Sequence, residues 1–502
     1  TLYQLSPDGR WLGFTERFTA WVRPSTDATK AVSVSRKGTA VPVHRVSQRA
    51  GEFLHWAADG KTLRWSNGPV LQSRSVANAQ SGGDETDTDD ALAVSDIDLS
   101  FEVSADKPTG RIALVGGTAI TMRDADNTQE IVNNAVILVK DNRIEAVFPK
   151  GEQAIPVDAQ QLDITGKVVI PGLIDAHAHG GLGSDEITPQ QNWMQYSNLA
   201  FGVTTIHDPS NDTSEIFAHG EMQRAGRVLG PRTFSTGTIL YGANAPGATS
   251  EVNNLEDARF HIQRLKAAGA ISVKSYNQLG RAARQQIIEA AAENQIMVVP
   301  EGGMKFQHNL NQLVDGHTSI EHALPIAHVY DDVDQLWQAI DTGYVPTFVV
   351  SYGGISGENY WYDRTDVWRN ERLMRYTPAQ FVEPISMRRT KAPDHHYNHF
   401  NVARTAKQLR DLGARVMIGA HGQREGLGAH WELWMMVHGG FTPWEALRGG
   451  TIDAAKHLGM DADLGSIEPG KLADLVVIDG DVLSDIQTSE QVLYTMINGR
   501  LY

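Results

Sequence analysis

Residues 168–179 read Val-Val-Ile-Pro-Gly-Leu-Ile-Asp-Ala-His-Ala-His, and this stretch decides the fold. Its apolar run predicts a buried strand, which Pro171-Gly172 interrupts and the two histidines end. In an extended strand residues i and i+2 share a face, so His177 and His179 point the same way. Two neutral imidazoles on one face can bind one divalent cation. The stretch therefore predicts a strand that delivers the first two ligands of a metal site.

After this stretch the chain alternates between expected strands and helices, from about residue 174 to residue 458. One example is a helix expected over 281–294, which precedes the apolar strand 296–299. Repeated strand-then-helix units imply a parallel sheet, and the length suits an eight-stranded barrel of about 250 residues. The fold class is therefore α/β, with a TIM-type (β/α)8 barrel that we place at residues 173–465.

Short β-like segments flank the expected barrel on both sides. Apolar residues gather in 135–139 and 144–147 before it, and in 475–479 after it. We therefore expect a small β-sandwich domain that is split around the barrel, formed by residues 101–172 together with 466–502.

The stretch 168–179 resembles the first barrel strand of the amidohydrolase superfamily, and further motifs extend the resemblance. Residues 202–206 (Gly-Val-Thr-Thr-Ile) are similar to the second strand, and residues 319–322 (Ser-Ile-Glu-His) are similar to the sixth. Residues 465–477 resemble the glycine-containing family motif at which the chain passes from the barrel back into the β domain. The resemblance covers roughly residues 110–502, is nearest to imidazolonepropionase-like and prolidase-like enzymes, and implies a metal-dependent hydrolase.

The resemblance implies a metal set that begins with His177 and His179. It continues with a strand-four lysine that is often carboxylated and then bridges two metals, and Lys274 stands at that position. Because burying an unpaired ammonium is costly, a lysine there is expected to be neutralised or modified. A salt-bridged lysine at the barrel mouth is the alternative. Strand six supplies His322 as a further ligand.

Two positions depart from the family pattern. The strand-five ligand is usually histidine, whereas Glu301 follows the apolar run here and can ligate through its carboxylate. Strand eight usually ends in an aspartate that ligates metal and takes a proton from water, but His421 stands there. Imidazole can also ligate and accept a proton. The candidates for the catalytic base are therefore His421, Asp208 and Glu301.

Loops after the strands are expected to carry specificity. Tyr352 and Trp361 lie in an aromatic-rich connection, and we interpret them as a substrate wall or lid, with packing against the N-terminal β segment as the alternative. His430 and Glu432 follow strand eight and are expected to shape the substrate site. Three further histidines are interpreted as rim or supporting groups rather than ligands: His395, His396 and His399.

The first seventy residues read as short β-strands that follow Asp-Gly turns. Residues 6–9 (Ser-Pro-Asp-Gly) precede an aromatic strand, and 58–61 (Ala-Asp-Gly-Lys) repeat the pattern about 50 residues later, the length of one propeller blade. These segments resemble the repeats of Tol-system propellers, with two unrelated hairpins as the alternative. Residues 1–100 are predicted to form an incomplete propeller-like β segment, ending in an acidic solvated linker around 84–90.

Composition excludes several classes of protein. The formal net charge is −16 and the basic residues are scattered, which disfavours a nucleic-acid partner. No apolar run reaches the roughly 18 residues needed to span a bilayer. The chain has no cysteine, so a metal must be held by histidine, carboxylate or modified lysine. The propeller resemblance implies a periplasmic or secreted protein, with a cytoplasmic location as the alternative.

Together these observations predict a hydrolase that cleaves a C–N bond through a metal-activated water, in a cyclic amide, a dipeptide-like amide or an amine-bearing ring. The expected cofactor is one or two divalent ions, zinc first, with manganese or iron as alternatives. The expected partner is a small-molecule substrate, and a homo-oligomer is compatible with the sequence. The second hypothesis is a barrel that has lost catalysis and acts as a binding or scaffold protein, which the missing strand-eight aspartate suggests.

Overall fold

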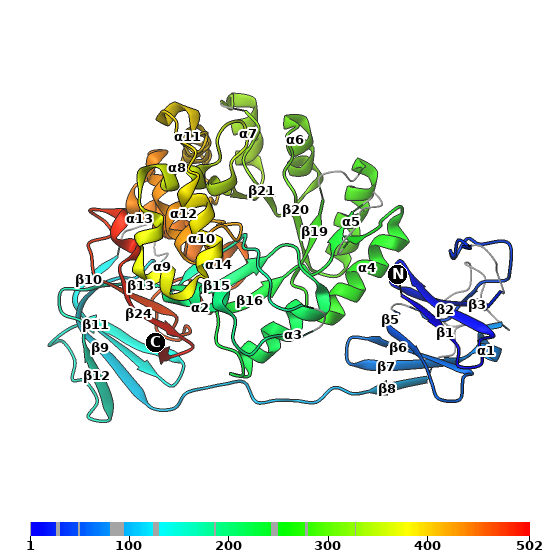
Figure 1. Ribbon diagram of the computed structural model, residues 1–502. Coiled ribbons are helices and arrows are strands. Elements are labelled where there is room, and N and C mark those ends of the chain that lie inside the picture. Colours follow the sequence, from blue (N-terminus) through cyan, green and yellow to red (C-terminus); the bar gives the residue numbers. More distant parts are fainter. Residues whose placement is uncertain are drawn as a thin grey trace.

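The computed structural model describes residues 2–26, 31–48, 51–80, 95–123, 130–184, 187–241, 249–276, 280–326 and 328–502. These residues form an N-terminal β segment, a small β domain and a large α/β barrel, with the first two at opposite ends of the third (Figure 1). The acidic run interpreted as a solvated linker lies outside the described residues. Among the helices described, none has the length and apolar character needed to cross a bilayer.

The N-terminal segment contains two four-stranded antiparallel sheets, each with its strands in chain order. The strands of the first sheet are β1 (Tyr3–Leu5), β2 (Trp11–Glu16), β3 (Thr19–Pro24) and β4 (His44–Arg45). Those of the second are β5 (Glu52–Trp56), β6 (Thr62–Asn67), β7 (Val70–Ser75) and β8 (Ser95–Asp98), with helix α1 (Val76–Gln80) between the last two. Buried residues of both sheets, such as Val22 and Trp65, share one core. The relationship of these sheets to a propeller stays a prediction.

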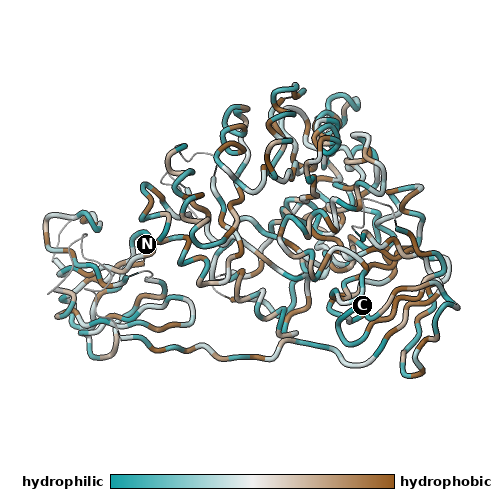
Figure 2. The backbone as a smooth tube through the Cα atoms, turned by 180° about the vertical axis from the view of Figure 1, so that it is seen from behind, coloured by the Kyte–Doolittle hydropathy of each residue, from teal (hydrophilic) through white to brown (hydrophobic). Residues whose placement is uncertain are grey.

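The small β domain is one eight-stranded sheet, with the path β11-β10-β9-β13-β23-β24-β25 and β12 beside β9. Its strands from before the barrel are β9 (Arg111–Ile120), β10 (Ile131–Lys140), β11 (Arg143–Pro149), β12 (Ala159–Asp163) and β13 (Val168–Pro171). Its strands from after the barrel are β23 (Leu475–Ile478), β24 (Val492–Ile497) and β25 (Arg500–Leu501). β13 and β23 pair antiparallel, and both are buried throughout, which explains their continuous apolar sequences. Figure 2 shows much hydrophobic colour on the strands of this domain.

The barrel strands are parallel and follow directly from this domain, since β13 leads into the first of them. They are β14 (Leu173–Asp175), β15 (Val203–Asp208), β16 (Arg232–Ser235), β17 (Ile239–Leu240), β18 (Thr249–Ser250), β19 (Ser272–Ser275), β20 (Met297–Pro300), β21 (Ser319–Glu321) and β22 (Gly343–Val345). They group into three sheets rather than one closed sheet. In the eight-strand count of such barrels β17 and β18 lie between the third strand, β16, and the fourth, β19, so β22 is the seventh. Residues 416–420 take the eighth position, because Met417 N–H donates to the carbonyl of Tyr344 while Ala176 N–H donates to the carbonyl of Ile418.

Helices cover the outside of these strands (Figure 1). In chain order they are α2 (Trp193–Ala200), α3 (Thr213–Arg224), α4 (Leu255–Ala268), α5 (Arg281–Glu293), α6 (Phe306–Asp315), α7 (Asp331–Ala339), α8 (Gly357–Arg364), α9 (Glu371–Tyr376), α10 (Ala379–Met387), α11 (His399–Asp411), α12 (Leu427–His438), α13 (Pro443–Gly449) and α14 (Ile452–His457). The helix expected over 281–294 is α5, and the strand expected next is β20. The fold is thus a TIM-type barrel with a small β domain.

One buried arginine joins the N-terminal segment to the barrel. The guanidinium carbon of Arg264, on α4, lies 3.9 Å from the centre of the Phe18 ring. Its Nη1 lies 3.5 Å from Glu52 Oε1 in the N-terminal segment, and its Nη2 donates to Ser250 Oγ at 3.1 Å. Arg264 is only 4% exposed, so this contact is a packed junction rather than a surface ion pair.

Candidate metal centre

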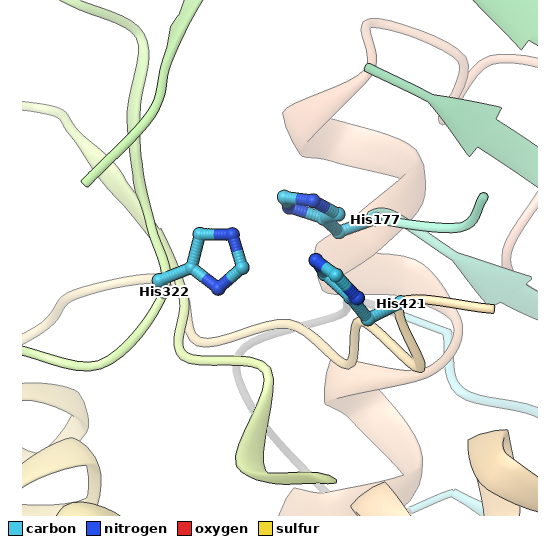
Figure 3. Close-up of side chains that lie close together, drawn as sticks. All are labelled: His177, His322 and His421. Carbon is cyan, nitrogen blue, oxygen red and sulfur yellow. The ribbon is translucent and has the colours of Figure 1, made fainter. Parts of the chain in front are cut away.

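Histidines from three distant strands converge at the carboxyl ends of the barrel strands. One nitrogen from each of His177, His322 and His421 lies within 4.8 Å of the other two. Figure 3 shows His322 facing His177 and His421 from the opposite side of the site. The ring of His179 lies beside them, with its centre 4.9 Å from that of His177 and 4.7 Å from that of His421. Four predicted ligands therefore share one location.

The backbone at this site takes conformations that side chains rarely adopt. His322 has φ +66° and His421 has φ +57°, both in the left-handed region. Such residues cost on the order of 1–3 kcal/mol and persist only where surrounding contacts enforce them. Gly302, directly after Glu301, is also required by its surroundings, because a Cβ there would lie 1.9 Å from the carbonyl oxygen of Glu321. The close packing of the strand ends thus fixes the backbone positions from which the ligand side chains project.

A buried carboxylate orients His177. Oε2 of Glu321 lies 2.5 Å from His177 Nδ1, and Ser319 Oγ donates to the other oxygen at 2.6 Å. Both His177 and Glu321 are almost fully buried. A carboxylate at Nδ1 favours the tautomer with its hydrogen on that nitrogen, so Nε2 presents its lone pair to the site. Nε2 of His177 lies 3.1 Å from Nε2 of His179.

Asp208 supports His179 in the same way. Its Oδ1 lies 3.1 Å from His179 Nδ1 and also accepts the Ser210 N–H, and its Oδ2 accepts the Asn211 side chain at 2.7 Å. Asp208 is 1% exposed. The aspartate that the sequence offered as a candidate base therefore lies behind a ligand, with both oxygens already bonded.

Lys274 and Glu301 form a buried ion pair at the site. Lys274 Nζ lies 2.6 Å from Glu301 Oε2, and His322 Nε2 lies 3.0 Å from Glu301 Oε1. Burial disfavours the charged form of Glu301, but Lys274 and His322 outweigh it and hold the pKa of this carboxyl below its usual value. In this structure Lys274 is therefore the salt-bridged lysine that was the alternative to a carboxylated one, and its partner Glu301 is ionised.

The rings of His177 and His421 have the charge state that a metal requires. Burial, followed by the neighbouring histidines, lowers the pKa of His421 to about 3, and burial also lowers the pKa of His177. Their rings are therefore neutral at pH 7 and keep a free lone pair. Nε2 of His322 is buried, and its contact with Glu301 Oε1 does not have the geometry of a hydrogen bond. The neutral imidazoles of His177 and His421, together with the ionised carboxylate of Glu301, fit a zinc-like divalent cation.

The predicted substrate residues have different placements. The ring of Tyr352 lies 5.5 Å from that of His322, beside the metal centre. Trp361 is 2% exposed and packs edge-on against Trp434, with a ring distance of 4.9 Å. The predicted lid role of Trp361 is therefore wrong, and so is the alternative of packing against the N-terminal segment, because its partner is α12. A buried ring in the helical layer offers no surface to a substrate.

His430 is also a packing residue, so the predicted substrate contact is wrong. Its Nδ1 lies 2.9 Å from Ser489 Oγ and its Nε2 lies 2.8 Å from the carbonyl oxygen of Phe201. The side chain has no exposed surface. The face of α12 that carries His430 packs toward α2 and the C-terminal β domain, whereas the metal centre lies at the strand ends.

The remaining histidines of the 395–399 cluster lie outside the metal group. His395 and His396 are exposed, while His399 is buried with its Nε2 3.2 Å from His438 Nδ1. Among the described residues, the metal group contains none of these three. Their interpretation as rim or supporting groups stays a prediction.

Three supporting residues were not identified from the sequence. Glu321 was noted only as part of the strand-six motif, although a carboxylate inside an apolar strand is itself a signal for a buried partner. Thr347 has φ +49° and its Oγ1 lies 2.8 Å from His322 Nδ1. Asp175 accepts the N–H groups of His177 and Ala420 through one oxygen. These contacts join residues from distant parts of the chain, which no local pattern reveals.

Comparisons with known proteins agree with this geometry. Residues 388–502 match the model of the Amidohydrolase family. A 5-methylthioadenosine/S-adenosylhomocysteine deaminase of Symbiobacterium thermophilum is 24% identical, over 78% of this chain and 93% of its own length. An imidazolonepropionase of the same organism is 23% identical, over 74% of this chain and 91% of its own.

The similarity to solved structures concerns the fold. A Xaa-Pro dipeptidase structure has a TM-score of 0.60 and 19% identity, and the match covers 78% of this chain and 99% of the dipeptidase. The barrel with its small β domain, the histidine cluster and the sequence relatives point to one conclusion. This chain is similar to members of the amidohydrolase superfamily: its sequence relatives include a deaminase and an imidazolonepropionase, and it shares the fold of a dipeptidase.

Proposed function

We propose that this protein is a metal-dependent hydrolase that cleaves a C–N bond of a small molecule. The observation that carries the proposal is the convergence of the four histidines with Glu301 at one end of the barrel. Each of the two strand-one histidines has a carboxylate behind its Nδ1. Such paired carboxylates are typical of metal-binding histidines, because they orient the ring and increase its basicity.

A divalent cation held there would lower the pKa of its water to about 7 and would polarise the carbonyl under attack. The residues that would hold it are His177 and His179 through Nε2, together with His322 and Glu301, and also His421 where its ring does not act as the base. We propose zinc, because imidazole nitrogens dominate this donor set. One ion with an unmodified Lys274 and two ions with a carboxylated Lys274 are distinguished by metal analysis and intact mass.

We propose His421 as the group that receives the proton of the attacking water. Asp208 supports His179, and Glu301 is paired with Lys274 and is a proposed metal ligand, so both carboxylates already have other roles. His421 is partly exposed, unlike His177 and His322, and its ring forms no hydrogen bond with the residues that the structure describes. A neutral imidazole has one lone pair, which in this role would accept the proton and would not bind the metal.

The substrate class includes cyclic amides, dipeptide-like amides and amine-bearing rings. Support comes from the names of the relatives, which include deaminases, imidazolonepropionases and a Xaa-Pro dipeptidase. Tyr352, beside His322, is the residue that we expect to contact the substrate. Export to the periplasm and the propeller origin of the N-terminal sheets also stay proposals. Cell fractionation tests the first, and the structure of a longer natural homologue tests the second.

A direct test combines metal analysis with a substrate panel. The purified protein is expected to contain one or two equivalents of zinc, manganese or iron. It should hydrolyse at least one member of a panel of Xaa-Pro dipeptides, N-acyl amino acids and cyclic amides, with loss of activity on chelation. A folded, metal-free protein that hydrolyses none of them, before or after zinc is added, would instead support the binding-protein hypothesis.

A further inference from the structure

Glu432, on α12, is a fully buried carboxylate that faces the ends of two barrel strands. Its Oε1 accepts the N–H of Val349 at 2.8 Å, and its Oε2 accepts the N–H of Gly419 at 3.4 Å. Val349 follows the seventh strand, whereas Gly419 belongs to the eighth strand position. One side chain therefore links the two strand ends from behind the metal centre.

The eighth strand end is held at three consecutive N–H groups. Gly419 N–H donates to Glu432, and Ala420 N–H donates to Asp175 Oδ1 at 3.1 Å. His421 N–H donates to the carbonyl oxygen of His177 at 2.7 Å. Each donor thus has an acceptor from a different source. Together they support the left-handed backbone of His421, which would otherwise be unfavourable.

The seventh strand end carries a second left-handed residue, Thr347, whose Oγ1 lies 2.8 Å from His322 Nδ1. Val349 lies two residues further along, inside the short 3-10 helix η2 (Phe348–Val350). By fixing Val349, Glu432 restrains the segment that orients His322. The same carboxylate therefore restrains the backbone segments that position His322 and His421, whose ring centres lie 5.0 Å apart.

The packing around Gly419 leaves little room for adjustment. A Cβ at this position would lie 2.7 Å from His177 Cβ and 2.6 Å from a methyl group of Val345. The first, seventh and eighth strand ends are therefore at close to their minimum separation here. A small shift of the eighth strand would be passed directly to His177.

We propose that Glu432 is a positioning residue that sets the spacing of His322 and His421 and thereby the affinity of the metal site. This inference rests on the proposed metal-dependent function. A carboxylate can accept hydrogen bonds at both oxygens, whereas a glutamine amide accepts at one and places an N–H2 group against the other donor. Replacing Glu432 by Gln therefore tests selectively whether both side-chain oxygens must accept a hydrogen bond, one from Val349 N–H and one from Gly419 N–H.

The experiment compares Glu432→Gln with the control variant Ser489→Ala. Ser489 is a buried hydrogen-bond partner of His430 and Trp434, which lie on α12 like Glu432. Zinc affinity is measured by competition with a chromophoric chelator, ligand geometry by the visible spectrum of the cobalt-substituted protein, and stability by thermal unfolding of the metal-free form. Glu432→Gln is expected to weaken zinc binding about 10- to 100-fold and to shift the cobalt bands. Ser489→Ala is expected to change only stability.

Wild-type zinc affinity and an unchanged cobalt spectrum in Glu432→Gln, with only a lower unfolding temperature, would overturn the inference. If Glu432→Gln does not fold, Glu432→Asp takes its place, because it keeps two acceptor oxygens but retracts them by one methylene. Weakened zinc binding in Glu432→Asp supports the inference and wild-type binding overturns it. A wild-type protein that binds no zinc at all would contradict the proposed function itself.

Discussion

Glu321 Oε2 lies 2.5 Å from Nδ1 of His177, and the two residues, 144 positions apart in the chain, are both buried at the barrel mouth. This contact decides which ring nitrogen of His177 is available to a metal. Replacing Glu321 by Gln should therefore weaken zinc binding about 10- to 100-fold and lower kcat/KM accordingly. Ser319→Ala removes only a donor to Glu321 and should have a smaller effect. Equal zinc affinities of Glu321→Gln and wild type, measured by chelator competition, would contradict the assigned role.

Substitution of His421 tests the residue that departs from the family pattern. His421→Ala should lower kcat at least 100-fold, since general base catalysis typically contributes 10²- to 10⁴-fold. His421→Asp supplies the residue usual in the family and should retain more activity than the alanine variant. Steady-state kinetics over a range of pH measures both effects. Wild-type kcat in His421→Ala, with normal metal content, would remove His421 from the mechanism.

Removal of metal should affect both activity and stability. A protein that holds zinc at 100 times its dissociation constant is stabilised by about 2.7 kcal/mol, so chelation should lower the unfolding temperature as well as abolish hydrolysis. Adding zinc should restore both, whereas magnesium should not, because magnesium prefers oxygen ligands and this site is rich in imidazole. Full recovery with magnesium alone would argue against the histidine set as the binding site.

His430 should make folding sensitive to acid. Burial lowers the pKa of His430 to about 4, below its unfolded value near 6.5. The unfolded chain therefore binds a proton more readily, and this part of the stability is present above pH 6.5 and is lost as pH falls toward 4. Between pH 7 and pH 4.5 the free energy of unfolding should fall by about 2–3 kcal/mol less in His430→Asn than in wild type, as measured by urea unfolding. Parallel pH profiles of the two proteins would show that His430 does not titrate in this way.

Arg264 should hold the N-terminal segment on the barrel. Arg264→Ala removes the contacts to Phe18, Glu52 and Ser250 and should cost about 1–3 kcal/mol at the junction, since these include hydrogen bonds of a buried charge. The N-terminal sheets should then be cleaved faster in limited proteolysis, while the barrel remains protected. Arg259→Ala, on the exposed face of the same helix, is the control and should change little. Similar cleavage rates in both variants would argue against a specific junction at Arg264.

Much of the site could be predicted from the sequence because its strongest signals are local. The two-residue spacing of His177 and His179 on a strand, and the placement of Lys274, Glu301, His322 and His421 after apolar runs, predicted residues that the structure brings together. Trp361 and His430 were assigned wrongly for the opposite reason. Their residue types and loop positions suggested a substrate site, but the side of a helix that faces the core depends on packing between helices, which local sequence does not reveal.

The sequence by itself determined that strands and helices alternate, that two imidazoles share one strand face and that nitrogen and oxygen ligands must hold any metal, since these properties follow from spacing and composition. Only the tertiary structure decided which carboxylate supports which histidine, as Glu321 does for His177 and Asp208 for His179. It also decided that His322 and His421 adopt left-handed backbone conformations. Those features depend on contacts between strand ends that are distant in the chain, and such contacts exist only once the barrel has assembled.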